Sequence, residues 1–424
     1  MRLVYSALLY ALLPLMVLRM LWRSRRAPAY RERLAERLGF FEPLGDGRPA
    51  IWVHAVSVGE TLAAAPLVET LLQRYPQYQV VVTTTTPTGS ERVRALFGER
   101  VFHVYAPWDT PGAVRRFMRR TRPALLLVME TELWPNLLHY AARGDCPVIL
   151  ANARLSARSA RGYQRVAGLT RAMLGCLSVV ACQARLDGDR FVALGLAPDA
   201  LQITGSIKFD IDLDPTLRQE VAQMKAALAR DARPVIVVAS THPGEDEQVL
   251  AAFKQVLVQQ ADCLLVLVPR HPERFDTVYE LCLDAGLSVC RRSLGSAPAD
   301  SDQVLLGDTM GELLKLLGCA DLAVIGGSLV EHGGHNALEA SAWGVAVVTG
   351  PYMFNFAEIA DLLEEAGAML RLEQPQDLSA CLPALLLDVE KRQVMGAAGL
   401  SVVEANRGAS ERLLALVDGC LRET

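Results

Sequence analysis

The chain has 424 residues, of which 51% are hydrophobic, and its formal net charge at pH 7 is −4. A chain of this length exceeds the size at which a single hydrophobic core stops growing, so we expect two globular domains. The near balance of charge argues against a nucleic-acid-binding protein, whose affinity would come from surplus basic residues. Nine cysteines without a C-x-x-C pair indicate buried free thiols rather than a zinc site or a disulfide framework.

The first element in chain order is an apolar segment that carries no charge over residues 3–18. Seven arginines follow within residues 19–37, against only two glutamates. A cleaved signal peptide has its basic residues before the apolar run, so this order favours an uncleaved membrane anchor with a basic flank, residues 1–26. The run is short for a span of about 20 residues and contains Pro14, so it predicts either a marginal span or a helix in the bilayer interface. A buried core helix is the alternative.

Beyond residue 50, β-prone runs alternate with helical patterns, which is typical of α/β proteins. Continuous apolar runs suit parallel strands that are buried on both faces. We therefore predict two doubly wound, Rossmann-like domains that face each other across a cleft. The predicted strands are residues 51–56, 79–84, 124–129, 147–151 and 178–182 in the first half, and residues 234–239, 262–268, 303–306, 321–325 and 344–349 in the second.

A charged stretch that ends at Pro234 separates the two halves. We expect an N-terminal domain over residues 27–210, a linker over 211–232 and a C-terminal domain over 233–400. The last helical pattern, residues 401–424, is a candidate to pack back on the first domain. The G-x-G-x-x-G motif and the G-x-x-x-x-G-K-[ST] loop are both absent, which removes the main support for an ordinary dehydrogenase or a P-loop enzyme.

Residues 51–62, IWVHAVSVGETL, predict a strand, a tight turn and the start of a helix. The turn places Glu60 in the first helical turn at the carboxyl end of a strand, the edge where ligands bind in open α/β sheets. The helix dipole favours an ionised carboxylate, which can accept a proton from a substrate hydroxyl. The alternative is that Glu60 only complements the helix dipole.

Other charged candidates of the first half follow later strands. Glu130 and Glu132 come directly after the apolar run 124–129, where a carboxylate can stabilise positive charge or complement a helix dipole. Lys208 lies at the domain junction and could reach an anionic leaving group, although a solvated surface lysine is the simpler interpretation. The segments 83–90 and 152–158 could hold acceptor phosphates or supply helix caps.

Three loops of the second half follow predicted strands and predict a nucleotide site. In residues 325–339, IGGSLVEHGGHNALE, paired glycines let the backbone approach a ligand, and a helix is expected to start near residue 334 or 335. Asn336 and Glu339 would share a face of that helix, and the carboxylate suits ribose hydroxyls. Arg270 can pair with a phosphate, and residues 307–312 open a further helix. No third ligand has a spacing that would complete a metal site with His332-x-x-His335.

Together these stretches resemble the 3-deoxy-D-manno-octulosonic acid (Kdo) transferases of lipid A biosynthesis over essentially the whole chain. The resemblance implies an inverting, metal-independent glycosyltransferase with two Rossmann-like domains (the GT-B architecture). The matching stretches are HAVSVGET at 54–61, TPTGSERV at 86–93, METELWPN at 129–136, ANARLSARS at 151–159, GSIKFD at 205–210, PRHPERF at 269–275, GDTMGEL at 307–313 and GGSLVEHGGHNALE at 326–339.

The resemblance also implies partners and roles. The enzyme would move Kdo from CMP-Kdo to lipid IVA, a tetraacylated, bisphosphorylated lipid A precursor, at the cytoplasmic face of the inner membrane. Glu60 would be the general base, and Glu130 and Lys208 would stabilise the transition state. Membrane lipids are expected partners, whereas a cofactor, a metal and nucleic acid are not. The implied CMP-binding residues are Pro269, Arg270, Met310, Gly311, Glu312, Asn336, Ala337, Leu338 and Glu339.

Three alternatives stay open. Another GT-B transferase or a nucleotide-sugar epimerase would have a similar second domain, but the apolar N-terminus and the 54–61 segment count against it. An oxidoreductase with a modified Rossmann loop would show nicotinamide-dependent activity. A membrane-tethered nucleotide-sugar-binding protein would show no turnover at all.

Overall fold

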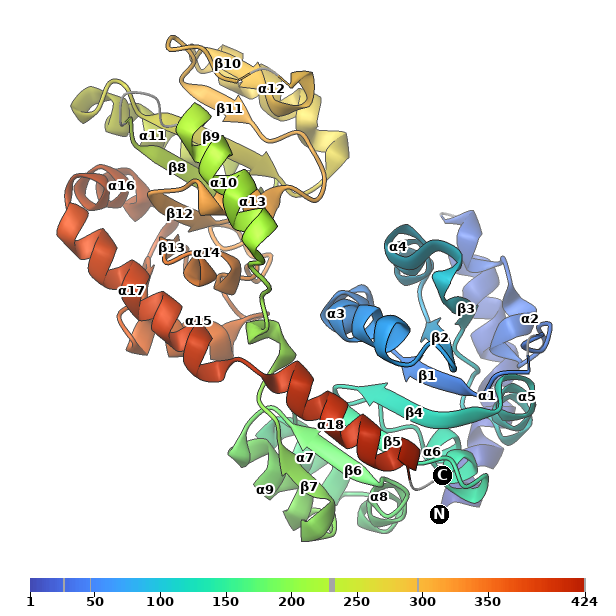
Figure 1. Cartoon of the computed structure of the whole chain (residues 1–424). Coiled ribbons are helices and arrows are strands. Elements are labelled where there is room, and N and C mark those ends of the chain that lie inside the picture. The colour runs from blue at the N-terminus through green and yellow to red at the C-terminus, as the bar shows by residue number, and fades with distance from the viewer. Residues whose placement is uncertain (26, 46, 229–232, 296, 423–424) are drawn as a thin grey trace. The chain divides into compact units, whose positions relative to one another are not determined.

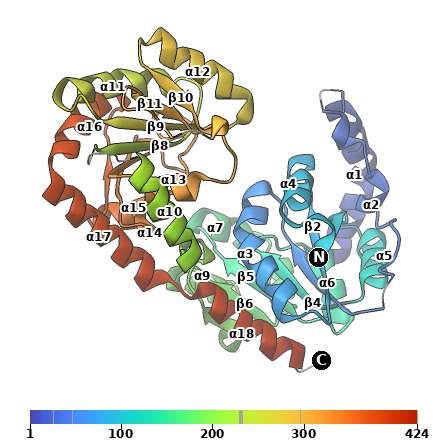
Figure 2. The same cartoon turned by 45° about the horizontal axis from the view of Figure 1, so that its top comes forward.

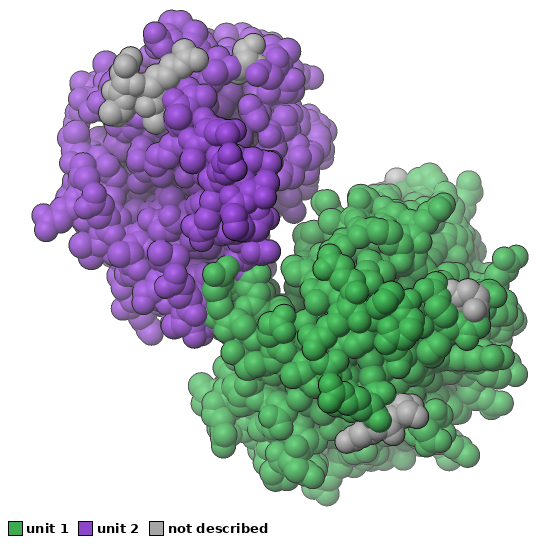
Figure 3. Space-filling model, viewed as in Figure 1, with its two compact units in different colours: residues 1–210, 407–424 green, residues 211–406 purple. Residues whose placement is uncertain are grey.

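The computed structural model describes residues 1–25, 27–45, 47–228, 233–295 and 297–422. They form two compact units, unit 1 from residues 1–210 and 407–424, and unit 2 from residues 211–406 (Figures 1 and 3). Each unit contains a seven-stranded sheet in which every neighbouring pair of strands is parallel. The predicted fold class, two Rossmann-like α/β domains, is therefore confirmed.

The sheet of unit 1 has the order β3-β2-β1-β4-β5-β6-β7. Its strands are β1 Ala50–His54, β2 Gln79–Thr84, β3 Phe102–Tyr105, β4 Pro123–Met129, β5 Val148–Ala153, β6 Val179–Cys182 and β7 Leu201–Ile203. Its central strands are buried on both faces, because α3, α4 and α18 pack on one side and α5, α6, α8 and α9 on the other. The helices are α1 Arg2–Arg23, α2 Leu34–Arg37, α3 Val58–Arg74, α4 Pro87–Phe97, α5 Pro111–Thr121, α6 Pro135–Arg143, α7 Ala157–Gln164, α8 Ala167–Leu174, α9 Arg185–Ala193 and α18 Ala409–Arg422.

The sheet of unit 2 has the order β10-β11-β9-β8-β12-β13-β14. Its strands are β8 Val235–Thr241, β9 Leu264–Pro269, β10 Val289–Arg291, β11 Val304–Leu306, β12 Leu322–Ile325, β13 Ala346–Thr349 and β14 Met369–Arg371. Helices α11, α12, α16 and α17 bury one face of it. The helices are α10 Pro215–Leu228, α11 Asp246–Gln259, α12 Phe275–Asp284, α13 Leu313–Gly318, α14 Leu338–Ala342, α15 Ala357–Glu365, α16 Leu378–Leu387 and α17 Val389–Asn406.

All ten predicted strands are present, with ends displaced by at most two residues. The four strands that the sequence did not predict, β3, β7, β10 and β14, are the two edge strands of each sheet. Edge strands are short and only partly buried here, so they lack the continuous apolar runs that mark the central strands.

The segments that join the two units differ in part from the predicted boundaries. The stretch predicted as a linker, 211–232, contains helix α10. This helix packs on α13 within unit 2 and buries Val221 and Leu228. Residues 229–232 lie outside the described residues. The unit boundary near the C-terminus falls after residue 406, so α18 groups with unit 1. Asp210 fixes the start of α18, because its carboxylate accepts hydrogen bonds from the backbone N–H groups of Gly408 and Ser410, each at 2.6 Å.

Helix α1, the dark blue helix at the edge of unit 1 in Figure 2, is the one described helix that is long and apolar enough to cross a membrane. Only 6% of its most apolar window is buried, so it is not a core helix. Its first turns are nevertheless held by unit 1. Arg2 and Ser6 each donate a hydrogen bond of 3.0 Å to the side-chain oxygen of Asn136, and the Tyr10 hydroxyl accepts one of 2.9 Å from Gly112 N–H.

Candidate functional site

The strand order of each sheet reverses beside its first strand. In unit 1, β1 lies between β2 and β4, and in unit 2, β8 lies between β9 and β12. At such a switch point the loops after two neighbouring strands run to opposite faces and leave a crevice at the carboxyl edge, where ligands bind. The predicted residues follow these strands: Glu60 comes after β1, Glu130 after β4, Arg270 after β9 and residues 336–339 after β12.

The turn between β1 and α3 holds the carboxylate of Glu60 in a fixed position. Ser57 is the N-cap of α3, and its hydroxyl accepts a hydrogen bond from Glu60 N–H at 3.2 Å. In return, the Glu60 carboxylate accepts hydrogen bonds of 2.8 Å from Val56 N–H and from the Ser57 hydroxyl. The S-x-x-E spacing is that of a capping box, but the backbone N–H that Glu60 binds is that of Val56 rather than of the N-cap residue Ser57. Glu60 is only 8% exposed.

Burial decides the protonation of Glu60. It raises the pKa of this carboxyl from 4.5 to about 7; the hydrogen bonds from Val56 and Ser57 oppose the shift, and the nearby Glu132 and Glu130 add to it. The sequence-based expectation that the helix dipole keeps Glu60 ionised is therefore incomplete, because desolvation of the charge outweighs the favourable dipole. A carboxylate with a pKa near neutrality is suited to accept a proton in a reaction at neutral pH.

Glu130 lies at the end of β4 in a strained backbone conformation. Its φ is +53°, in the left-handed region that non-glycine residues rarely adopt. Its carboxylate accepts hydrogen bonds from Arg154 Nε at 3.1 Å and is 3.0 Å from Arg154 Nη2. Arg154 comes from the segment after β5. The sequence marked that segment as basic but did not predict this pair, because nothing in the order of residues shows that β5 lies beside β4.

Lys208 lies in a 3-10 turn, Ile207–Phe209, that follows β7. This turn is drawn back towards β5, because Ile207 N–H donates a hydrogen bond of 3.2 Å to the side-chain oxygen of Asn152. Asn152 is itself in the left-handed region, with φ of +53°, and its buried side-chain nitrogen has no hydrogen-bond partner among the described residues. The turn that carries Lys208 is thus tied to β5, the strand beside β4.

In unit 2, three of the predicted residues come together. The side chain of Asn336 donates a hydrogen bond to the Glu339 carboxylate, and the charge of Arg270 acts on the same group. Burial is the largest influence, and it raises the pKa of Glu339. Pro269 is the last residue of β9, and the side chains of Ala337 and Leu338 are buried beside this group.

One detail of this loop differs from the expectation. Helix α14 begins at Leu338 rather than near residue 334 or 335, so Asn336 precedes the helix. Gly333 and Gly334 have φ of +91° and +73°, outside the helical region, so the helix cannot include them. The helix has only five residues, so the phosphate-binding role expected of its start has little support from a helix dipole.

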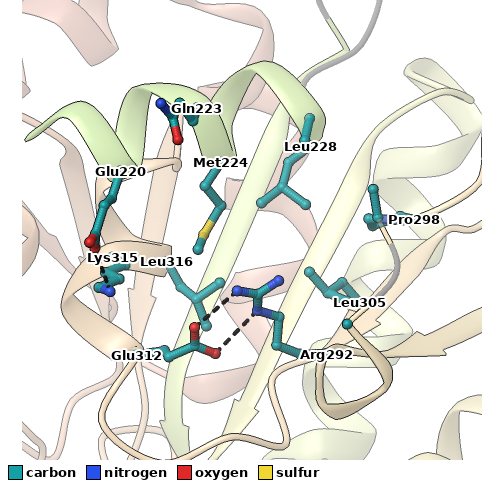
Figure 4. A pocket seen from close by; sticks show the side chains of 13 residues that line it. Glu220, Gln223, Met224, Leu228, Arg292, Pro298, Leu305, Glu312, Lys315 and Leu316 are labelled. Atoms are coloured by element: carbon teal, nitrogen blue, oxygen red, sulfur yellow. Dashed lines mark hydrogen bonds and ion pairs between the residues drawn. The ribbon is translucent and has the colours of Figure 1, made fainter. Parts of the chain in front are cut away.

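Met310, Gly311 and Glu312 lie in the segment between β11 and α13. Arg292, which the sequence analysis did not single out, donates hydrogen bonds to the Glu312 carboxylate from Nη2 at 2.9 Å and from Nε at 3.1 Å, and it lowers the pKa of that carboxyl (Figure 4). The pair lines a cavity of about 390 Å³ beside α10. Arg270, Asn336 and Glu339 do not line this cavity.

Metal ligation finds no support in the part of the chain that the structure describes. Within those residues, no group of three or more His, Cys, Asp or Glu side chains is arranged to hold a metal ion.

Comparison with known proteins gives concordant results. A family model described as 3-deoxy-D-manno-octulosonic-acid transferase matches residues 32–211, and one for glycosyl transferases group 1 matches residues 247–402. The 3-deoxy-D-manno-octulosonic acid transferase of Haemophilus influenzae is 44% identical over 418 residues, 98% of this chain and 98% of the relative. That of Bordetella pertussis is 39% identical over 97% of each chain.

A solved structure, the UDP-GlcNAc 2-epimerase of Neisseria meningitidis bound to UDP-GlcNAc, shares the fold. It matches with a TM-score of 0.56 over 88% of this chain and 100% of that chain, at 14% identity.

The raised pKa of Glu60 predicts a specific pH dependence of stability. Glu60→Gln keeps the size and one acceptor oxygen, which can still accept the hydrogen bond from Val56 N–H, but removes the charge. In the wild type, folded Glu60 holds its proton up to about pH 7 and the unfolded chain only to about 4.5, so ionisation costs stability as the pH rises through that window. The free energy of unfolding of Glu60→Gln relative to wild type should therefore increase between these values and then level off.

Chemical denaturation at a series of pH values measures this difference. Glu69→Gln, on the same helix but at the surface, is the matched control and should show no such increase. A Glu60→Gln protein whose stability follows the wild-type pH profile would contradict the raised pKa.

Proposed function

The chain belongs to the 3-deoxy-D-manno-octulosonic acid transferase family of glycosyltransferases, and we propose that it moves Kdo from CMP-Kdo to lipid IVA with inversion at the anomeric carbon. The 44% identity to the Haemophilus influenzae transferase over 98% of both chains carries the assignment of Kdo transfer. The choice of acceptor and the stereochemistry rest on the resemblance of the sequence motifs and on the chemistry of the residues at the two switch points.

Glu60 acts as the general base in this proposal. Its carboxylate takes the proton of the acceptor hydroxyl, the oxygen attacks the anomeric carbon of Kdo, and the bond to the phosphate of CMP breaks with its electron pair. A single displacement of this kind inverts the anomeric centre. The support is that Glu60 is immobilised by two hydrogen bonds, faces the switch point of unit 1, and has a pKa of about 7.

Glu130 and Lys208 stabilise the charges of the transition state in the same proposal. The sugar develops positive charge and the departing phosphate negative charge, so a carboxylate and an ammonium group are the complementary partners. The positive φ of Glu130 supports this role, because strained backbone is retained where the side-chain position matters for function. Arg154 acts as a positioning residue that holds the Glu130 carboxylate.

The nucleotide binds to unit 2 in this proposal. Arg270 pairs with the phosphate. The Glu339 carboxylate accepts hydrogen bonds from the ribose hydroxyls, and Asn336 donates a hydrogen bond to them. Pro269, Ala337 and Leu338 shape the same loops, and Met310, Gly311 and Glu312 contact the base. CMP carries one phosphate and lacks the diphosphate that commonly recruits Mg²⁺ in nucleotide-sugar enzymes, so a metal-independent reaction is expected.

Helix α1 holds the enzyme at the inner membrane in this proposal, with both units on the cytoplasmic face. Its first turn is bonded to Asn136, and the segment after it is held by Arg33, whose Nη2 donates a hydrogen bond of 2.9 Å to the backbone oxygen of His103. Because its first turns are bonded to unit 1, α1 lies along the membrane rather than across it in this proposal. Its outward side chains include Leu3, Val4, Leu8, Leu15, Leu18 and Trp22, all exposed, and the arginines that follow suit anionic headgroups.

Glu60→Gln should abolish transfer while CMP affinity stays near the wild-type value, because the general base lies in unit 1. Loss of general base catalysis costs roughly 100-fold or more in rate. The wild-type rate should rise with pH and level off above about 7, because only the ionised carboxylate accepts a proton. Mass spectrometry of the lipid product measures transfer, and activity of Glu60→Gln within a few-fold of wild type would exclude the assigned role.

Arg270→Ala and Glu339→Ala should each weaken CMP binding, because both remove a charged partner from the proposed nucleotide site. Truncation of a charged, partly desolvated partner costs on the order of 2–5 kcal/mol. Calorimetric titration with CMP measures the change, with the exposed Glu273→Ala as control. Wild-type CMP affinity in both variants would place the nucleotide site elsewhere.

The membrane proposal predicts that Leu15→Glu with Leu18→Glu weakens binding to anionic phospholipid vesicles. These side chains are 61% and 60% exposed on α1, and each leucine withdrawn from water contributes about 1.5–3 kcal/mol. Leu186→Glu, a leucine that is 69% exposed on α9, is the control and should leave vesicle binding unchanged. Co-sedimentation at low and high salt measures the effect, and equal binding of the double variant and the wild type would refute the assignment of α1.

A further inference from the structure

Four of the seven histidines of the chain gather at the switch point of unit 2. His242 follows β8, His271 follows β9, and His332 and His335 follow β12. These three strands are neighbours in the order β9-β8-β12, so their carboxyl ends lie side by side. None of these four histidines has a role in the function proposed above, although His335 directly precedes Asn336.

His242 is the centre of this four-histidine cluster. Its ring stacks on that of His332 with centroids 4.1 Å apart, and it meets the ring of His271 edge-on at 5.6 Å. The Nε2 atoms of His242 and His335 are 2.8 Å apart, and the two ring planes are within 8° of each other. These two imidazoles therefore share one hydrogen bond, head to head, in nearly the same plane.

The shared hydrogen bond limits the protons that the pair can hold. One Nε2 must donate and the other must accept, because two N–H groups pointing at each other over this distance would clash. A further proton can enter only at a remaining ring nitrogen, which makes one ring an imidazolium hydrogen-bonded to a neutral partner. The pair can thus carry a single positive charge that is supported by a strong, charge-assisted hydrogen bond.

The groups around the cluster are basic, and the nearby acids are engaged elsewhere. Burial is the main reason that the pKa of His242 falls to about 4. The positive charges of Arg274 and Arg270 lower this pKa further. Burial also lowers the pKa of His335 to about 3, so both rings are neutral at pH 7. The neighbouring carboxylates have other partners: Glu245 accepts N–H groups of His242, Gly327 and Leu329, Asp246 pairs with Arg274, and Glu339 with Asn336.

We propose that this four-histidine cluster, with Arg270, is the subsite for the phosphate of the nucleotide, and that it takes up one proton from solvent when the phosphate binds. The inference rests on the donor site proposed above and deepens it. An anion placed against the cluster supplies the negative charge that its surroundings lack, which favours the protonated form of the His242–His335 pair. The nucleoside part contributes nothing to this uptake, because it carries no charge at neutral pH.

The test is calorimetric titration of the full-length protein with CMP in two buffers that differ in ionisation enthalpy, since the difference in heat counts the protons bound. At about pH 8 the phosphate of CMP is fully ionised, because its second pKa is about 6. We expect net proton uptake with CMP, larger at pH 7 than at pH 8 because the free pair has pKa values of about 4 and 3, and none with cytidine, which lacks the phosphate. Imidazole proton signals in NMR spectra, assigned from single variants, should shift for the cluster histidines only.

The variants are His335→Gln, which removes one half of the shared bond, and His332→Gln, whose exposed position makes misfolding a minor concern. His335→Gln should abolish the proton uptake and weaken CMP binding by about 10-fold to 100-fold, the range for losing a charge-assisted hydrogen bond. His332→Gln should reduce the uptake. His139→Gln, in α6 of unit 1, is the control and should behave as wild type.

The outcomes separate the two proposals. CMP binding without proton uptake, or with uptake that both cluster variants retain, would overturn the subsite and leave the proposed function standing. Equal uptake with cytidine would also overturn it, because the phosphate would not be the cause. Failure of the wild type to bind CMP at all would overturn the donor assignment together with the subsite.

Discussion

The reversal of strand order in each parallel sheet is the constraint on which the rest of the structure depends. Parallel strands need crossover connections over a face of the sheet, and the chain fills both faces by starting at a central strand and building outward in two directions. The crevice at the reversal follows from this topology before any side chain is considered. Glu60 and Glu130 flank it in unit 1, and the histidines with Arg270 flank it in unit 2.

Desolvation then acts in opposite senses at the two switch points. In unit 1 it raises the pKa of an acid, Glu60, and in unit 2 it lowers the pKa of two bases, His242 and His335. Both shifts disfavour the charged form of the group concerned. In the proposed reaction both sites gain a proton. The raised pKa makes Glu60 a stronger proton acceptor, whereas the lowered pKa keeps the histidines neutral until an anion binds beside them.

The sequence predicted the buried parts of the fold well and the edges poorly. A central parallel strand is apolar along its whole length and stands out from neighbouring segments, whereas an edge strand such as β10 is short and only half-buried at each of its residues. The contact of Ser57 with Glu60 could be read from the S-x-x-E spacing. The partners Arg154 and Arg292 could not, because each meets its glutamate across 20 or more residues of chain.

The sequence by itself determined the fold class, the family motifs and the elements that carry Glu60, Glu130 and Arg270, because hydrophobic periodicity and turn chemistry are local properties. The tertiary structure alone decided the protonation of Glu60, the position of α18 in unit 1 and the meeting of four histidines from three strands. The physical reason is that desolvation and packing depend on neighbours that are distant in the chain. Local order of residues specifies which side chains are available, and only the folded sheet specifies what surrounds them.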